Sequence, residues 1–171
     1  MENKVFLRID AKNTRKNLLM SAISERAVEY IRMERIYKNS ENVMIFYPTK
    51  NEINLLSLLS DYKQFYLPRV KGDDLEVCPY SVGDELNKSD FNISEPLSEA
   101  AKPETLDLVI VPALMADEEG FRLGYGGGFY DRFLASCPDS VKTITVIPKE
   151  LFVKELPHEE FDIKIDRIIC A

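Results

Sequence analysis

The segment of this chain best suited to binding chemistry is RLGYGGGFYD, residues 122–131. Its four glycines fall within five positions, at Gly124, Gly126, Gly127 and Gly128. Because glycine has no Cβ atom, such a loop can adopt positive φ angles and turn successive backbone N–H groups toward one anion. At the start of a helix these donors add to the helix dipole, which is typical of phosphate sites. Arg122 adds a permanently charged guanidinium whose fork geometry matches phosphate oxygens.

The glycine pattern alone leaves three interpretations open: a phosphate cradle, a tight turn, or close packing of a helix. The segment does not match the dinucleotide-binding fingerprint G-x-G-x-x-G, because Phe129 stands where the third glycine would be. It does not match the Walker loop either, because no Lys followed by Ser or Thr comes directly after the last glycine. Asp131 lies about one turn into the helix that we expect to follow. Its carboxylate either complements the helix N-terminus or shares Mg²⁺ with phosphate oxygens, the arrangement that this cation usually adopts.

The elements around this loop predict an α/β fold. Apolar residues recur every three or four positions between Leu19 and Ile31, which indicates a helix with one buried face. Residues 70–105 lack a clear period and predict long loops with at most short strands. Strands alternating with helices indicate one domain over residues 1–171, a mostly parallel sheet with helices on both faces. We expect strands at 43–47, 64–68, 106–112, 142–147 and 165–170, and further helices at 52–62, 128–137 and 149–156.

The composition fits one soluble domain and narrows the class of partner. The 171 residues are 45% hydrophobic and carry a net charge of −7, which argues against nucleic acid as a general partner. The longest apolar run, residues 108–116, is too short to span a membrane, and the first twenty residues are too charged for a signal peptide. Three dispersed cysteines and one histidine favour neither a disulfide framework nor a soft-metal site. We expect a cytoplasmic protein.

Residues 122–131 resemble, without a gap, the motif R-L-G-x-G-x-G-[YF]-Y-D of the 5-formyltetrahydrofolate cyclo-ligases, also called methenyltetrahydrofolate synthetases. Shorter pieces follow the order and spacing of that family, so the resemblance covers nearly the whole chain. They are K-x-x-L-R at 4–8, IFYPTKNEI at 45–53, LPR at 67–69, EP at 95–96 and LP-x-x-x-x-D-x-x-x-D at 156–166. The resemblance implies a Rossmann-like sheet of the kind found in ribose-phosphate isomerases and CoA transferases.

The resemblance also implies an activity, the ATP- and Mg²⁺-dependent ring closure of 5-formyltetrahydrofolate to 5,10-methenyltetrahydrofolate, which releases ADP and phosphate. In that reaction the formyl oxygen accepts the γ-phosphoryl group and so becomes a leaving group. The reduced folate supplies both nucleophiles, so no Ser, Cys or His nucleophile is required. The protein has to align two substrates and stabilise the charge on the phosphoryl group, as in other phosphoryl transfers.

By the same resemblance, individual residues take on roles. Arg122 and Asp131 are the expected catalytic residues, Asp131 and Asp162 match the positions that hold Mg²⁺, and Tyr47 and Glu52 match those that contact the folate. Lys4 and Arg8 match the leading basic residues that bind ATP in the family, and because they are four positions apart they share one face of a helix. The residues expected to bind ATP are Lys4, Arg8, Arg122, Gly124, Tyr125, Gly126, Gly127, Gly128, Phe129 and Tyr130.

Three positions depart from the residues common in the family. Ala116 replaces an aromatic residue, and Pro148 and Leu151 stand where many members have F-x-x-Q, so an amide is missing. Two alternatives therefore stay open beside the enzyme. One is a non-catalytic relative that binds nucleotide or folate, and the other is a sugar-phosphate or acyl-transfer enzyme on the same fold.

Overall fold

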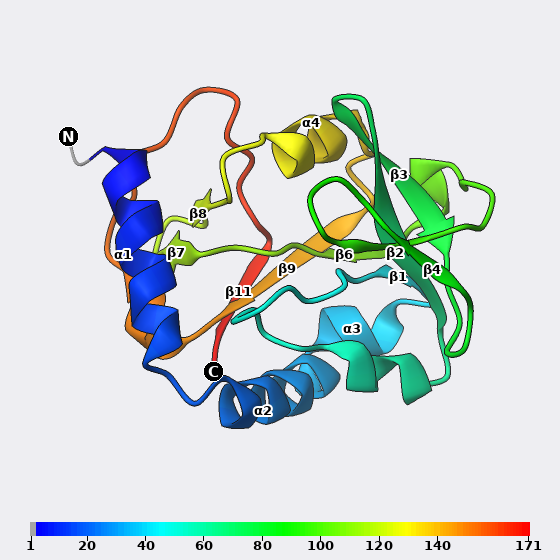
Figure 1. Ribbon diagram of the computed structural model, residues 1–171, viewed down its shortest axis with the longest axis horizontal. Coiled ribbons are helices and arrows are strands. Elements are labelled where there is room, and N and C mark those ends of the chain that lie inside the picture. The colour runs from blue at the N-terminus through cyan, green and yellow to red at the C-terminus, as the bar shows by residue number, and fades with distance from the viewer. Residues whose placement is uncertain (1–2) are drawn as a thin grey trace.

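A computed structural model describes residues 3–171 (Figure 1). The helices are α1 (Lys4–Lys16), α2 (Met20–Met33), α3 (Arg35–Asn39) and α4 (Phe129–Ser136), with the 3₁₀ helices η1 (Leu56–Ser60), η2 (Pro103–Thr105) and η3 (Lys149–Leu151). The strands are β1 (Asn42–Met44), β2 (Gln64–Lys71), β3 (Asp74–Pro79), β4 (Leu86–Lys88), β5 (Ser94–Pro96), β6 (Leu108–Ile110), β7 (Met115–Asp117), β8 (Arg122–Leu123), β9 (Lys142–Ile147), β10 (Phe152–Val153) and β11 (Arg167–Cys170). Within residues 3–171, no helix has both the length and the apolar character needed to cross a membrane.

The central sheet has six strands in the order β11-β9-β6-β1-β2-β3. All neighbouring pairs run parallel except β2 and β3, which form an antiparallel edge. A small second sheet, β10-β7-β8, carries the chain from the end of β6 to the glycine-rich segment. The predicted α/β class with a mostly parallel sheet is confirmed.

Both faces of the central sheet are covered. Along β1, Val43 packs in an apolar cluster with Ile31 of α2, whereas the next residue, Met44, packs in a second cluster with Phe133 of α4. Successive side chains of a strand point to opposite faces, so this alternation places α2 and α4 on opposite sides of the sheet, as Figure 1 shows. Burial on both faces explains why the run 43–46, which begins in β1, and β6 are continuously apolar in the sequence.

The connections that follow β1 and β6 create the place for a ligand. These two strands are parallel neighbours. The chain leaves β1 on the face of α2, through η1, and leaves β6 toward the face of α4. Where neighbouring strands of an α/β sheet diverge in this way, a crevice opens at their carboxyl ends, and ligands usually bind there. Figure 1 shows α1, β7 and β8 standing together at this edge.

Two of the predicted α-helices are wrong. Residues 52–62 form only the 3₁₀ helix η1, because the Asn54 side chain accepts a hydrogen bond from the Leu56 N–H and the Asn54 N–H donates to Ser24 of α2. Residues 149–156 form η3 and then β10, which pairs with β7. In both segments a tertiary partner outweighs the local preference for an α-helix.

The expectation of mostly irregular chain over residues 70–105 is correct except for β3. This six-residue strand pairs with β2, which continues past the proline that we expected to end it. Pro68 lies beyond the last residue of β2 that pairs with β1 and opposite Val77 of β3. A missing N–H therefore costs no bond to β1.

Candidate functional site

The glycine loop, residues 124–128, joins β8 to α4 at the carboxyl edge of the sheet. Gly126 and Gly128 have positive φ angles of 109° and 68°. Gly128 is the N-cap of α4, and no side chain caps the helix. Because the first N–H groups of a helix have no intrahelical acceptor, an anion can take the place of the missing cap.

Helix α1 presents basic side chains to this loop. The Arg8 Nε donates to the Gly124 carbonyl at 2.9 Å, and a Cβ atom added at Gly126 would lie 3.4 Å from the Arg8 Cζ. One helical turn further along α1, the Lys12 Nζ lies 5.8 Å from the centre of the Tyr125 ring. The structure thus brings together the predicted Arg8 and the glycine loop, and adds Lys12 at the next position of the same helix face.

The buried Arg122 and the half-buried Asp131 form an ion pair on the other side of the loop. The Arg122 Nη1 donates to the Asp131 Oδ1 at 3.0 Å and to the Ile163 carbonyl at 3.3 Å. The same carboxylate oxygen accepts the Ile163 N–H at 3.1 Å. The Arg122 side chain is only 3% exposed, and in this structure its guanidinium holds the Asp131 carboxylate in place.

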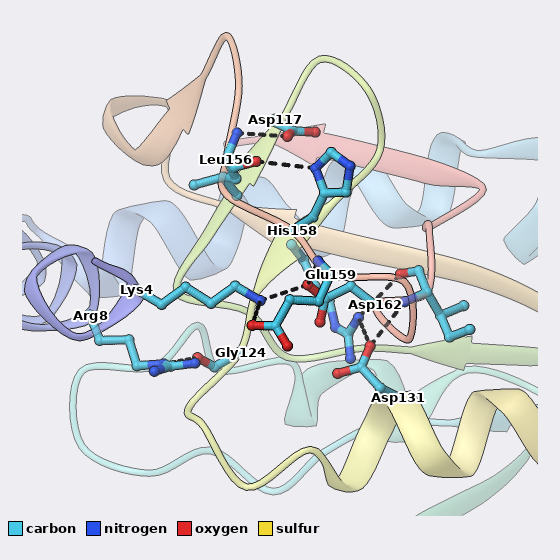
Figure 2. A network of polar contacts seen from close by, with 11 residues as sticks. Lys4, Arg8, Asp117, Gly124, Asp131, Leu156, His158, Glu159 and Asp162 are labelled. Carbon is cyan, nitrogen blue, oxygen red and sulfur yellow. Dashed lines mark hydrogen bonds and ion pairs between the residues drawn. The ribbon is translucent and has the colours of Figure 1, made fainter. Parts of the chain in front are cut away.

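Asp162 lies next to this pair and faces α1 (Figure 2). Its Oδ2 accepts a 2.6 Å hydrogen bond from the Lys4 Nζ and a 2.8 Å bond from the Glu159 N–H. Lys4 also lies 3.5 Å from the Glu159 carboxylate. Residue 163 connects the two halves of the network, since Asp162 precedes it in the chain and Asp131 accepts its N–H.

The two aspartates suit a magnesium ion that is bound to phosphate. Their contacts fall on one oxygen each, Oδ1 of Asp131 and Oδ2 of Asp162, and the second carboxylate oxygens have no such partner among residues 3–171. Mg²⁺ takes hard oxygen ligands, commonly one or two carboxylates completed by phosphate oxygens and water. Across the described chain, no three His, Cys, Asp or Glu side chains gather into a metal cluster.

Glu52 and Tyr47, the predicted folate contacts, follow β1 on the opposite side of the crevice. The Glu52 Oε2 accepts hydrogen bonds from the Thr49 N–H at 2.7 Å and from its hydroxyl at 2.6 Å, which fixes the carboxylate. Tyr47 is half-buried against the cluster beneath β1. Burial, and then the Glu52 carboxylate, raise the pKa of both Tyr125 and Tyr130 well above the ordinary phenol value. The charge of Glu52 therefore reaches the glycine loop.

A cavity of about 390 Å³ adjoins Glu52. It lies between the start of α2 and η1, and its walls carry mainly polar side chains. They are Met20, Ser21, Ser24, Glu25, Glu52, Asn54, Leu56 and Ser57. Phe129, expected at the nucleotide, packs edge-on against Phe91 with ring centres 5.8 Å apart.

The sequence reasoning did not identify Arg15, the most buried basic residue of α1. The residue is 3% exposed, and its Nη2 donates to the carbonyls of Ala113 and Leu114, which lie between β6 and β7. The four basic residues at positions 4, 8, 12 and 15 follow one another at steps of four, four and three, which places them on one helix face, and this spacing is the signal that could have revealed Arg15.

The three positions that depart from the family pattern, Ala116, Pro148 and Leu151, are all buried. Ala116 is fully buried in β7, opposite Phe152. Leu151 packs in the apolar cluster that joins α1 to β7 and β8, with Leu114 among its neighbours. Pro148 is the N-cap of η3. At position 151 the change from an amide to leucine therefore fills the core beneath the loop.

Comparison with known proteins identifies the family of this chain. The chain is 30% identical to a 5-formyltetrahydrofolate cyclo-ligase of Mus musculus over 78% of its own length and 74% of the relative's, and 25% identical to one of Mycoplasma genitalium over 95% and 90%. An NMR structure of Aquifex aeolicus 5,10-methenyltetrahydrofolate synthetase matches with a TM-score of 0.85 and 28% identity, covering 98% of this chain and 89% of that one. A Mycoplasma pneumoniae 5,10-methenyltetrahydrofolate synthetase shares the fold, with a TM-score of 0.74, 18% identity and coverage of 99% and 98%. The model of the 5-formyltetrahydrofolate cyclo-ligase family matches residues 1–171, and this chain therefore belongs to that family.

Proposed function

We propose that this chain closes the ring of 5-formyltetrahydrofolate to give 5,10-methenyltetrahydrofolate, with conversion of ATP to ADP and phosphate. The observation that carries the proposal is the pairing of two half-sites across one crevice. One half holds the uncapped start of α4, the basic face of α1 and two aspartates. The other half holds the fixed carboxylate of Glu52, whose charge acts on Tyr125 of the glycine loop.

The nucleotide half suits a triphosphate. The N–H groups of the first turn of α4 and the guanidinium of Arg8 supply donors and positive charge on two sides of the loop. Asp131 and Asp162 would hold Mg²⁺, and when bound this ion neutralises charge on the β- and γ-phosphate oxygens. Lys4 holds Asp162 in place through their 2.6 Å contact.

The folate half suits a flat ring with several N–H donors. The Glu52 carboxylate accepts such donors, and the Tyr47 ring offers a flat apolar surface. Because the pKa of Tyr125 and that of Tyr130 lie above the ordinary phenol value, both hydroxyls stay protonated at neutral pH. They can therefore donate hydrogen bonds without adding negative charge beside a phosphate.

The chemistry needs alignment more than a protein nucleophile. The formyl oxygen bonds to the γ-phosphorus as the bond from that phosphorus to ADP breaks. The side-arm nitrogen then attacks the activated carbon, the C–O bond breaks to release phosphate, and the nitrogen loses its proton. In both steps the residues of the crevice hold the reacting atoms together and stabilise the charge that moves.

The ligands that we propose are ATP and a reduced folate, and we place the activity in the cytoplasm. A net charge of −7 is unfavourable for nucleic acid, whereas the basic residues face the crevice, where small anions are expected.

The deciding experiment follows the absorbance of methenyltetrahydrofolate with purified protein, ATP, Mg²⁺ and 5-formyltetrahydrofolate. We expect turnover by the wild type and a fall in kcat of at least about 100-fold in Asp131→Asn, because the variant loses a charge that acts on the moving phosphoryl group. Asp139→Asn, the same chemical change just beyond the end of α4, is the matched control and should leave kcat unchanged.

Other outcomes point to other functions. Tight binding of ATP and folate without any turnover would indicate a non-catalytic relative. Activity on a sugar phosphate or an acyl donor without ATP would indicate a different enzyme on the same fold. Each result contradicts the proposal.

A further inference from the structure

Arg15 is 3% exposed and makes no ion pair among residues 3–171. The Glu52 carboxylate acts on its charge, but without an ion-pair contact. The Arg15 Nη2 donates to two main-chain carbonyls, whereas its buried Nε–H has no acceptor. Burying a guanidinium is costly, and burial lowers the pKa of Arg15 from its ordinary value. Two carbonyl groups alone could be satisfied by a neutral donor, so the retained charge calls for an anionic partner.

The guanidinium lies where the two half-sites meet. Its acceptors, Ala113 and Leu114, follow β6, and the Leu114 N–H donates to the carbonyl of Leu123 at 2.7 Å. Leu123 directly precedes the glycine loop, so Arg15 lies behind the strand pair that carries that loop. The groups whose charges act on it are Tyr125, from the loop, and Glu52, from the folate half.

The other basic residues of the site are already engaged. Lys4 is bound to Asp162, the Arg8 Nε to Gly124, and the Arg122 Nη1 to Asp131. The Nε of Arg122 is also buried without an acceptor, but the guanidinium of Arg122 already has a carboxylate partner. Arg15 is the one among these four that is bound to neither a carboxylate nor the glycine loop in the described chain. Because Tyr125 belongs to the glycine loop and Glu52 to the folate half, we place Arg15 near the point where the terminal phosphoryl group would meet its acceptor.

We propose that Arg15 is a catalytic residue that binds the phosphoryl group while it moves from ATP to the formyl oxygen. This inference rests on the proposed function. As the bond to ADP breaks and the new O–P bond forms, negative charge spreads over the three phosphoryl oxygens. The free Nε–H of Arg15 donates to one of these oxygens, and the positive charge of its guanidinium stabilises the phosphoryl group during the transfer. Because the contact strengthens in the transition state, it should raise kcat more than it tightens ATP binding.

Two substitutions separate this role from a structural one. Arg15→Gln removes the charge but keeps an N–H donor for the Ala113 and Leu114 carbonyls. Arg15→Lys keeps the charge but loses the fork, and it serves as the second variant if the first does not fold. We expect the same thermal midpoint and an ATP dissociation constant within about threefold of wild type, with kcat lower by about 100-fold in Arg15→Gln and about 10-fold in Arg15→Lys.

The second readout is binding rather than turnover. Aluminium fluoride with MgADP imitates the phosphoryl group in transfer, so the wild type should bind the pair at least about 100-fold more tightly than MgADP alone. Arg15→Gln should lose this gain and keep its affinity for MgADP. The matched control is Arg32→Gln, since Arg32 also donates to a main-chain carbonyl, that of Ser57, but belongs to the outer face of α2. It should retain the gain.

The outcomes distinguish this inference from the proposed function. If the wild type turns over and Arg15→Gln keeps its kcat and its affinity for the mimic, the role of Arg15 is wrong and the function stands. If the wild type binds the mimic through Arg15 but does not convert 5-formyltetrahydrofolate, the folate reaction is wrong and the phosphoryl contact stands. A rise in the KM for ATP with unchanged kcat would assign Arg15 to ground-state binding and overturn the inference.

Discussion

At the scale of single residues, the crevice is organised by ion pairs that hold aspartates in place. Arg122 and the Ile163 N–H both bind the Asp131 Oδ1, and Lys4 and the Glu159 N–H both bind the Asp162 Oδ2. In each case one carboxylate oxygen is fixed while the second remains for a ligand. Positioned in this way, the carboxylates need little reorganisation when magnesium and phosphate bind.

Arg122→Ala tests this arrangement. The substitution leaves Asp131 without its cation and should raise the KM for ATP about 10-fold or more, the usual effect of losing one charged hydrogen bond. The KM for 5-formyltetrahydrofolate should change less than about twofold, because Glu52 and Tyr47 lie on the other side of the crevice. Steady-state kinetics with each substrate varied in turn measure both values.

The control for that experiment is Arg167→Ala. Arg167, the first residue of β11, forms an exposed ion pair with Glu34, which lies between α2 and α3. Neither residue belongs to the glycine loop or to the folate half, so removing this arginine should change neither KM. Equal increases in both KM values for Arg122→Ala would count against a role on the nucleotide side.

At the scale of elements, the glycine loop is shaped by its backbone and by its neighbours. Gly126 combines a φ of 109° with the close approach of Arg8 from α1. A Cβ atom at Gly127 would lie 2.7 Å from the Phe129 ring, and one at Gly128 would lie 2.6 Å from the Arg132 Nη1. Glycine at these positions therefore serves both a positive φ and close packing.

Gly126→Ala and Gly83→Ala form a matched pair that separates these two effects. Gly83 has a similar φ of 96°, but nothing lies within 4 Å of a Cβ atom there. Both substitutions should lower the free energy of unfolding by about 1–3 kcal/mol, since alanine disfavours this backbone conformation. Gly126→Ala alone should weaken ATP binding, by about 10-fold, because relief of the strained φ moves the N–H groups of the glycine loop, whereas Gly83 lies outside that loop. Urea unfolding and calorimetry measure the two quantities, and equal ATP affinity in both variants would contradict the role of the glycine loop.

Much of the architecture was predictable, because strong patterns report burial. The buried run of β6, the strand β9 and the helix after Gly128 follow from apolar continuity and from glycine before a helix. The chain over 52–62 was not predictable, because its shape depends on Ser24 of α2, thirty residues away in the sequence. Local periodicity cannot show such a partner.

The site itself divides in the same way. Arg8 contacts the glycine loop and Lys4 contacts Asp162, all residues that helix spacing and a known motif had singled out, while their roles stay predictions. Arg15 was missed because its significance lies in what it lacks, an acceptor for its Nε–H, and that becomes visible only in three dimensions. The burial of Leu151 was hidden for the same reason, since a motif position does not show which way its side chain packs.

At the scale of the whole molecule, the ligand crevice and the stability of the fold depend on different parts of the chain. The crevice lies at the carboxyl ends of β1 and β6. The elements on the α2 face of the sheet are tied together by Asp61, which follows η1. Its Oδ1 accepts a 2.7 Å hydrogen bond from Arg32 of α2, and its Oδ2 accepts one of 2.7 Å from the Tyr37 hydroxyl of α3. One carboxylate therefore joins three elements beneath the sheet.

The dependence of stability on pH should report this junction. Burial alone would raise the pKa of Asp61, but the hydrogen bonds from Arg32 and Tyr37 outweigh burial, and the pKa lies below its ordinary value of 3.8. A carboxyl whose pKa is lowered in the folded state contributes stability above the unfolded-state pKa and loses it as the pH falls through the folded-state pKa. Since Arg32 is 41% exposed, we expect the wild type to exceed Asp61→Asn by only about 1 kcal/mol at pH 7.

That difference in the free energy of unfolding should shrink steadily as the pH is lowered below 4, because the wild-type carboxyl then becomes protonated in the folded protein as well. Urea unfolding of both proteins at a series of pH values measures it. For Asp139→Asn, whose carboxylate makes no ion pair within residues 3–171, the difference from wild type should be small at every pH. A gap between wild type and Asp61→Asn that stays constant down to pH 3 would show that Asp61 stabilises the fold through its shape rather than through its charge.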